Sequence, residues 1–98
     1  MEKLKILIAD DHKLVREGIK ITLSQDNSLF EFERMDEASN GEEAVIKAEL
    51  FDYDLILMDI NMPIMDGIEA TKKIKSDKTS KNKIIALSMH SEEFQIKS

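Results

Sequence analysis

Three polar signals, each directly after a short apolar run, carry the chemistry that this chain could perform. They are a pair of carboxylates, a third carboxylate and a hydroxyl: Asp10-Asp11 after residues 4–9, Asp59 after residues 55–58, and Ser88 after residues 84–87. Carboxylates gathered in one place repel one another unless a cation lies among them. We therefore expect a hard metal ion, together with a ligand that the metal helps to bind.

The apolar runs are typical of strands in a parallel sheet. They are short and rich in Ile and Leu, and amphipathic helix patterns separate them, as in a sheet buried on both faces. The expected strands are residues 4–10, 30–36, 54–59 and 83–88, the second a half-exposed edge strand. The expected helices are residues 12–24, 39–51 and 66–75, with one more beginning at Ser91.

Two of these helices have predicted starts. Ser39-Asn40-Gly41-Glu42 has the S-x-x-E form of a capping box. Asp66, with Glu69 three residues later, is typical of the first turn of the third helix.

Right-handed crossovers and short connections favour a doubly wound α/β sheet of the flavodoxin-like kind, with strand order 2-1-3-4. The first and third strands are then neighbours about 4.8 Å apart, which brings Asp10, Asp11 and Asp59 within reach of one ion. Ligands in such sheets bind beyond the carboxyl ends of the strands. Oxygen ligands with retained waters suit Mg²⁺.

Composition limits the classes of protein that this chain can be. Its 98 residues allow one small domain, and the absence of cysteine excludes thiolate metal sites and fits a cytoplasmic protein. A net charge of −6 argues against direct nucleic-acid binding by this segment. No apolar run approaches the roughly 20 residues that span a bilayer, so no membrane is expected among its partners.

Taken in order, the motifs resemble the receiver domain of bacterial two-component response regulators. The motifs are Asp10-Asp11, the segment from Leu57 to Gly67 around Asp59, and Ser88. Residues 10–19 and 86–90 are similar to the LuxR/NarL-type subfamily in particular. The resemblance covers the whole chain and implies a signalling module, not a turnover enzyme, in which Asp59 accepts a phosphoryl group from a sensor histidine kinase.

The resemblance also implies a role for each site residue. Asp11 and Asp59 would bind Mg²⁺ directly, Asp10 would act mainly through water, and the main-chain carbonyl of Asn61 would complete the protein ligands. Ser88 would donate its hydroxyl to a phosphoryl oxygen and move toward the site after phosphorylation. The intact protein would control transcription.

Each residue also has an ordinary structural explanation. An Asp at a strand end or before a helix is common, and Ser88 alone fits a turn. His12 is expected near the acidic cluster without being a ligand. Asn61 and His90 lie where members of the family vary, so either can modulate dephosphorylation, although an ordinary histidine in a solvated loop is the favoured explanation of His90. The joint order of the motifs favours function for the aspartates and Ser88.

Receiver domains continue through a fifth strand and a fifth helix, with a phosphoryl-pairing lysine after that strand. Residues 1–98 are therefore expected to be a receiver domain truncated before these elements, without an output domain; Lys97 does not match the lysine. Without the fifth strand, residues 83–88 would form an exposed apolar edge, and without the fifth helix one sheet face would lose its cover. This predicts a homo-oligomer.

Two alternatives differ in what Asp59 does. A pseudo-receiver would keep the fold as a protein-interaction module without accepting phosphate. A Mg²⁺-dependent aspartyl phosphatase would require a second aspartate two residues after the nucleophile, where this chain has Asn61.

Overall fold

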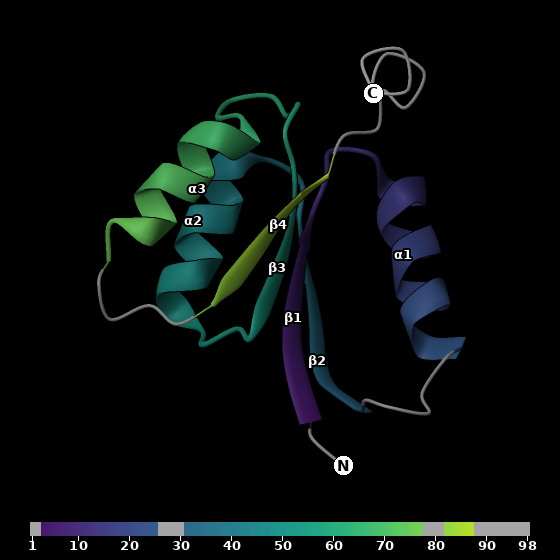
Figure 1. The fold of residues 1–98 in the computed structure, drawn as a ribbon. Coiled ribbons are helices and arrows are strands. Elements are labelled where there is room, and N and C mark those ends of the chain that lie inside the picture. Colours follow the sequence, from purple (N-terminus) through teal and green to yellow (C-terminus); the bar gives the residue numbers. More distant parts are fainter. Residues whose placement is uncertain (1–2, 26–30, 78–81, 88–98) are drawn as a thin grey trace, which may run out of the picture.

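The computed structural model describes residues 3–25, 31–77 and 82–87. Within them, four parallel strands form one sheet in the order β2-β1-β3-β4, which confirms the predicted α/β topology (Figure 1). The strands are β1 (Lys3–Ala9), β2 (Glu31–Ala38), β3 (Leu55–Asp59) and β4 (Lys83–Leu87). β1 and β3 are neighbours, as the predicted position of the site requires.

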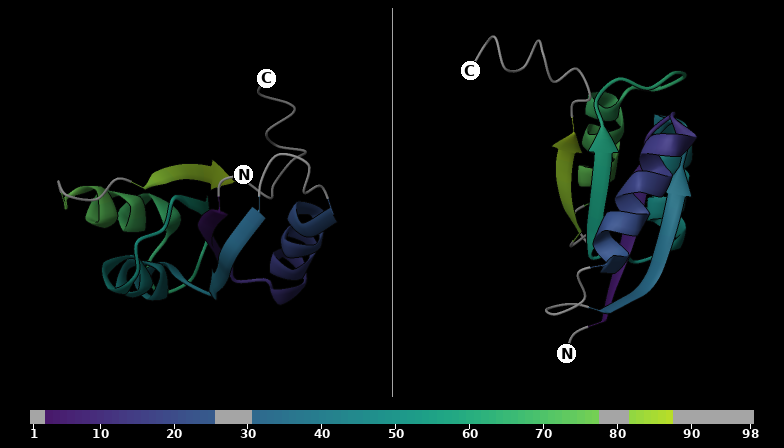
Figure 2. Two further views of the ribbon diagram at one scale, coloured as in Figure 1. Left: turned by 90° about the horizontal axis from the view of Figure 1, so that it is seen from below. Right: turned by 90° about the vertical axis from the view of Figure 1, so that its right-hand side faces the viewer.

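Three helices connect the strands: α1 (Lys13–Gln25), α2 (Gly41–Leu50) and α3 (Gly67–Lys75). α2 and α3 lie on one face of the sheet and α1 lies on the other, beside β1 and β2 (Figure 2). The helix predicted to begin at Ser91 lies outside the described residues. No helix in the described ranges is both long enough and apolar enough to cross a membrane.

The start of α2 differs from the predicted capping box by one residue. The N-cap is Asn40, not Ser39, and its side chain accepts a hydrogen bond from the main-chain N–H of Glu43. The Glu43 carboxylate, rather than that of Glu42, reaches back to the N–H of Ser39. Asn and Ser cap helices about equally well, so the sequence pattern alone does not decide between the two registers.

The start of α3 agrees with the prediction. Asp66 is its N-cap, and a side-chain oxygen of Asp66 accepts a hydrogen bond of 2.8 Å from the N–H of Glu69. The helix ends at Lys75, as expected.

The core lies mainly between the sheet and the α2–α3 pair. Residues 6–9 of β1 are fully buried, which the near-continuous apolar run of a central parallel strand predicts. Apolar side chains from both layers complete this core, including Leu7, Ile56, Met58, Ala70 and Ile74.

The sheet edge at β4 is less covered. β4 has no fully buried residue, and Ile85 is 49 % exposed. The expectation that the run 84–87 is buried on both faces is therefore wrong for the described structure. α1 lies beside β1 and β2, away from β4, and so does not cover β4 (Figure 1). Among the described strands, β4 lies at the edge of the sheet, and Ile85 on it is partly exposed.

Candidate functional site

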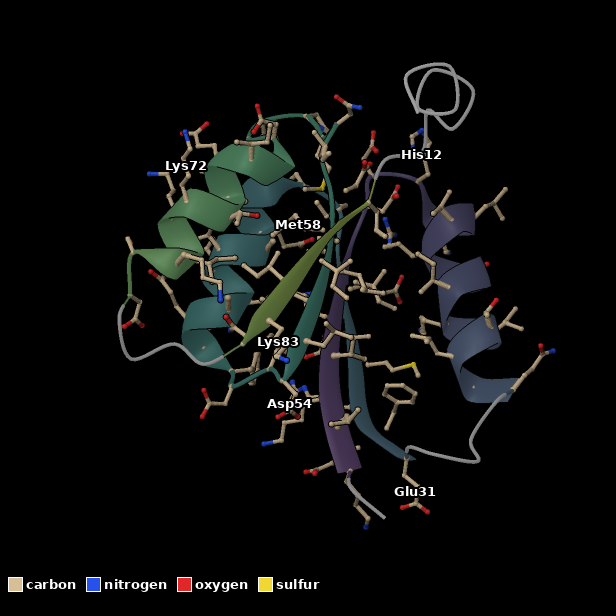
Figure 3. All side chains as sticks on the ribbon, in the orientation of Figure 1. His12, Glu31, Asp54, Met58, Lys72 and Lys83 are labelled. Atoms are coloured by element: carbon tan, nitrogen blue, oxygen red, sulfur yellow. The ribbon has the colours of Figure 1, made fainter. Side chains whose placement is uncertain are left out.

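The predicted acidic residues come together where β1 and β3 end. One ligand atom from each of Asp10, Asp11, His12 and Asp59 lies within 4.8 Å of the others. Figure 3 shows His12 at this end of the sheet, where the chain passes from β1 into α1. The site arises because β1 and β3 pair in parallel, so that their carboxyl ends reach the same edge.

Asp10 is the most deeply buried member of the site, with no exposed surface. Its Oδ1 accepts a 2.8 Å hydrogen bond from the main-chain N–H of His12, whereas its Oδ2 is buried and has no hydrogen-bond partner. A buried carboxylate oxygen without a partner is costly. The unpartnered Oδ2 of Asp10 therefore favours a bound cation at this site.

Asp59 is 2 % exposed. Burial raises the pKa of its carboxyl above the usual value, and the charges of Asp10 and Asp11 raise it further. The main-chain N–H of Asn61 donates a hydrogen bond of 3.2 Å to Asp59 Oδ1, which partly offsets this rise in the pKa. The surroundings therefore compensate the negative charge of the Asp59 carboxylate only in part.

Asp11 and His12 form the more exposed side of the site. His12 Nδ1 lies 3.1 Å from Asp11 Oδ1 and 3.2 Å from Asp10 Oδ1. The expectation that His12 lies beside the acidic cluster is confirmed, and α1 begins one residue after it. The turn between β1 and α1 brings the imidazole within reach of both carboxylates at once.

The donor set fits a hard divalent cation. It offers three carboxylates, one of which has an unsatisfied buried oxygen, at the open end of two adjacent strands. Mg²⁺ prefers one or two protein carboxylates and keeps several of its waters, and this set offers enough carboxylates for such a site. Asn61 lies two residues after Asp59, in the loop that follows β3.

The loop after β3 is fixed by close main-chain contacts. Gly67 donates its N–H to the carbonyl of Ile60 at 2.9 Å, and a Cβ at position 67 would lie 2.1 Å from the Asp59 carbonyl oxygen. Gly41 packs on the far end of the same loop, where a Cβ would lie 2.1 Å from the carbonyl oxygen of Met65. Both close approaches are to main-chain atoms, so a side chain at position 67 or 41 would force the chain to shift.

The residues that fix the main-chain carbonyl of Asp10 were not predicted from the sequence. Arg16 donates from Nη1 to the main-chain carbonyl of Asp10 and from Nε to Glu37. Arg16 lies one turn into α1 and Glu37 near the end of β2. The sequence did not mark Arg16 for this role, because the amphipathic pattern placed it on the polar face of the first helix.

Ser88 and His90 lie outside the described residues, so their predicted roles stay predictions. The residue before Ser88 is described: the carbonyl of Leu87 accepts a hydrogen bond of 3.0 Å from the N–H of Ile60. Because Ile60 directly follows Asp59, the end of β4 at Leu87 lies close to the acidic site.

Comparison with known proteins gives a family match over nearly the whole chain. Residues 6–98 match the response regulator receiver domain. The transcriptional regulatory protein DegU of Brevibacillus brevis is 42% identical over 91 residues, which cover 93% of this chain and 37% of that protein. The response regulator protein VraR of Staphylococcus aureus is 46% identical over 74 residues, covering 76% of this chain and 34% of that protein. The chain thus spans about a third of the length of these relatives.

Solved structures agree with the same assignment. The response regulator protein TrrA of Thermotoga maritima, determined in complex with Mg²⁺ and BeF, matches with a TM-score of 0.74 and 38% identity, covering 94% of this chain and 73% of that one. The signal receiver domain of the putative response regulator NarL of Mycobacterium tuberculosis matches with a TM-score of 0.77 and 30% identity, covering 92% and 69%.

Proposed function

The chain belongs to the response regulator receiver domain family, and from that premise we propose that Asp59 accepts a phosphoryl group from a sensor histidine kinase. The observation that supports this most directly is the position of Asp59. It is a buried carboxylate at the end of a central strand, within 4.8 Å of two further carboxylates, one of which has a buried oxygen without a partner.

The proposed reaction exchanges one phosphorus bond for another. The P–N bond of the phosphohistidine breaks while a P–O bond forms to a carboxylate oxygen of Asp59, and the imidazole leaves with the bonding electrons and takes up a proton. Asp59 must be ionised to attack. The N–H of Asn61 holds one carboxylate oxygen, Oδ1, and thereby orients the other.

Asp11 and Asp59 are proposed to bind Mg²⁺ directly, with Asp10 acting mainly through water and the carbonyl of Asn61 completing the set. When bound, the cation supplies positive charge that keeps Asp59 ionised and neutralises the phosphoryl oxygens. The chain itself supplies position: β1 and β3 fix the aspartates, and the glycine at the start of α3 lets that helix approach Asp59.

Ser88 is proposed to respond to phosphorylation by donating its hydroxyl to a phosphoryl oxygen. The hydrogen bond between Ile60 and Leu87 supports this, since it joins the residues that follow Asp59 and precede Ser88. Asn61 and His90 are proposed to modulate the lifetime of the acyl phosphate. The chain is proposed to act in the cytoplasm as a signalling module without turnover chemistry of its own.

The role of the intact protein is likewise proposed from its relatives. DegU is a transcriptional regulatory protein, and this chain corresponds to about a third of its length. We propose that phosphorylation of the present domain controls transcription through a part of the protein other than these residues, whose net charge of −6 disfavours contact with nucleic acid. A homo-oligomer that covers β4 is proposed for the present chain.

Incubation with the small-molecule phosphodonor acetyl phosphate tests the proposal. We expect Mg²⁺-dependent addition of one phosphoryl group, detected by intact-mass spectrometry and lost in Asp59→Asn. Asp52→Asn is the matched control, because Asp52 is an exposed carboxylate before the opposite end of β3. A chain that binds Mg²⁺ but is never labelled would favour the pseudo-receiver.

A further inference from the structure

Arg16 connects the acidic site to the end of β2. Its side chain is 14 % exposed and donates in two directions: Nη1 to the main-chain carbonyl of Asp10 at 2.6 Å, and Nε to Oε1 of Glu37 at 2.8 Å. The planar guanidinium suits this task because its donors point along fixed directions.

Glu37, which accepts the hydrogen bond from Arg16 Nε, is itself held by two further hydrogen bonds. Its second carboxylate oxygen accepts a hydrogen bond of 3.0 Å from Lys20 Nζ, and its main-chain carbonyl accepts one from Lys47 Nζ. The hydrogen bonds from Arg16 and Lys20 lower the pKa of the Glu37 carboxyl. Glu37 therefore remains ionised at neutral pH and keeps its hold on Arg16.

Both main-chain polar groups of Asp10 are consequently tied to β2. The N–H of Asp10 donates directly to the carbonyl of Ala38 at 2.9 Å, and its carbonyl is tied through Arg16 to Glu37. The carbonyl belongs to the planar peptide that joins Asp10 to Asp11, so fixing it limits rotation of that peptide. A fixed peptide plane restricts ψ of Asp10 and φ of Asp11, and these two torsions set how the two aspartates are oriented relative to each other.

We propose that Arg16, supported by Glu37, is a positioning residue that fixes the Asp10–Asp11 peptide and so aims both carboxylates at the bound cation. This inference rests on the proposed function, because it assigns Arg16 a part in the same metal site. Arg16 itself donates to no carboxylate of that site in the described structure; it acts through the main chain. Partners of this kind, one step removed from a metal, commonly change metal affinity about 10–100-fold when they are replaced.

Lys20 provides a matched control. It bonds Glu37 as Arg16 does, but among the hydrogen bonds of the described residues it makes none to Asp10. Replacing Lys20 therefore removes a charge and a contact from the same carboxylate while leaving the Asp10 carbonyl in place. Replacement of either Arg16 or Lys20 is expected to lower thermal stability, but only replacement of Arg16 is expected to change metal affinity.

The test measures Mg²⁺ and Mn²⁺ affinity by calorimetry, with thermal unfolding of every variant as a record of stability. We expect Arg16→Met to weaken binding about tenfold, and Lys20→Met to remain within about twofold of the unaltered chain. Arg16→Lys is expected to stay weakened, since one ammonium cannot reach Asp10 and Glu37 in the same fixed geometry. A double variant of Arg16→Met with Glu37→Gln should bind no more weakly than Arg16→Met alone.

The amide resonance of His12 gives a second readout without metal, because that N–H donates to Asp10 Oδ1. It should shift in Arg16→Met and not in Lys20→Met. Failure of the unaltered chain to bind either metal would contradict the proposed metal site itself. Binding by the unaltered chain and by Arg16→Met with equal affinity would overturn the role of Arg16. If Arg16→Met does not fold, Arg16→Lys and Glu37→Gln decide the matter by the same comparison.

Discussion

The start of α3 touches the main chain of the proposed phosphoacceptor: Gly67 lies so close to Asp59 that a Cβ would stand 2.1 Å from the Asp59 carbonyl oxygen and 3.0 Å from the Cα of Ile60. Both contacts are with backbone, which cannot rotate away as a long side chain can. Gly67 therefore couples the position of α3 to the position of Asp59.

Gly67→Ala is expected to lower the free energy of unfolding by about 1–3 kcal/mol, the usual cost of forcing an extra methyl group into a packed place. Gly18→Ala is the control, because Gly18 lies in the middle of α1 and a Cβ there meets nothing within 4 Å. It should raise stability by about 0.5–1 kcal/mol. Urea unfolding of both variants gives the two values. Equal effects would mean that the approach of α3 to Asp59 is less tight than described.

Metal binding should depend unequally on the two adjacent aspartates. We expect Asp11→Asn to weaken Mn²⁺ binding more than Asp10→Asn, since Asp11 is the proposed direct ligand and Asp10 the water-mediated one. Paramagnetic broadening of amide resonances locates the ion. Broadening centred away from residues 10–12 and 59–61 would show that the site has been assigned wrongly.

Asp59→Asn is expected to stabilise the metal-free chain at neutral pH. Burial raises the pKa of folded Asp59, as do the neighbouring carboxylates, so its ionised form destabilises the fold. Removing the charge should raise the free energy of unfolding by about 1–3 kcal/mol, the cost of an incompletely satisfied buried group.

The same carboxyl predicts a pH dependence with a definite sign. Because its folded pKa is raised, the contribution of Asp59 to stability is fully present below the unfolded pKa and is lost as the pH rises through the folded pKa. The stability difference between Asp59→Asn and the unaltered chain should therefore grow with pH across this interval. Saturating Mg²⁺ should reduce it. A difference that is constant with pH would argue that Asp59 is not held in an unfavourable environment.

The exposed edge at β4 predicts self-association. Ile85 lies on this strand and is 49 % exposed, and Ile46 on α2 is equally exposed but lies away from the edge. We expect sedimentation at micromolar concentration to show an oligomer that Ile85→Lys dissociates and Ile46→Lys does not. A cooperatively folded monomer at that concentration would contradict the proposed oligomer.

Much of the fold and the proposed aspartates could be predicted from the sequence. The strand order follows from short apolar runs that alternate with amphipathic helices, because connections in such folds are short and right-handed. Once β1 and β3 are neighbours, Asp10, Asp11 and Asp59 must approach one another at the carboxyl ends. Local patterns also marked Asp66 as an N-cap.

The tertiary structure decided what depends on how distant segments meet. The close approach of Gly41 to the loop at Met65 and the link from Arg16 to Glu37 join residues that are far apart along the chain, at spacings with no regular period. The tilt of a helix against a sheet, set by the packing of many side chains, determines which of these pairs come into contact. The exposure of β4 also depends on the tertiary structure. An apolar run indicates that its side chains favour burial, but the neighbouring elements determine what fraction of their surface is buried.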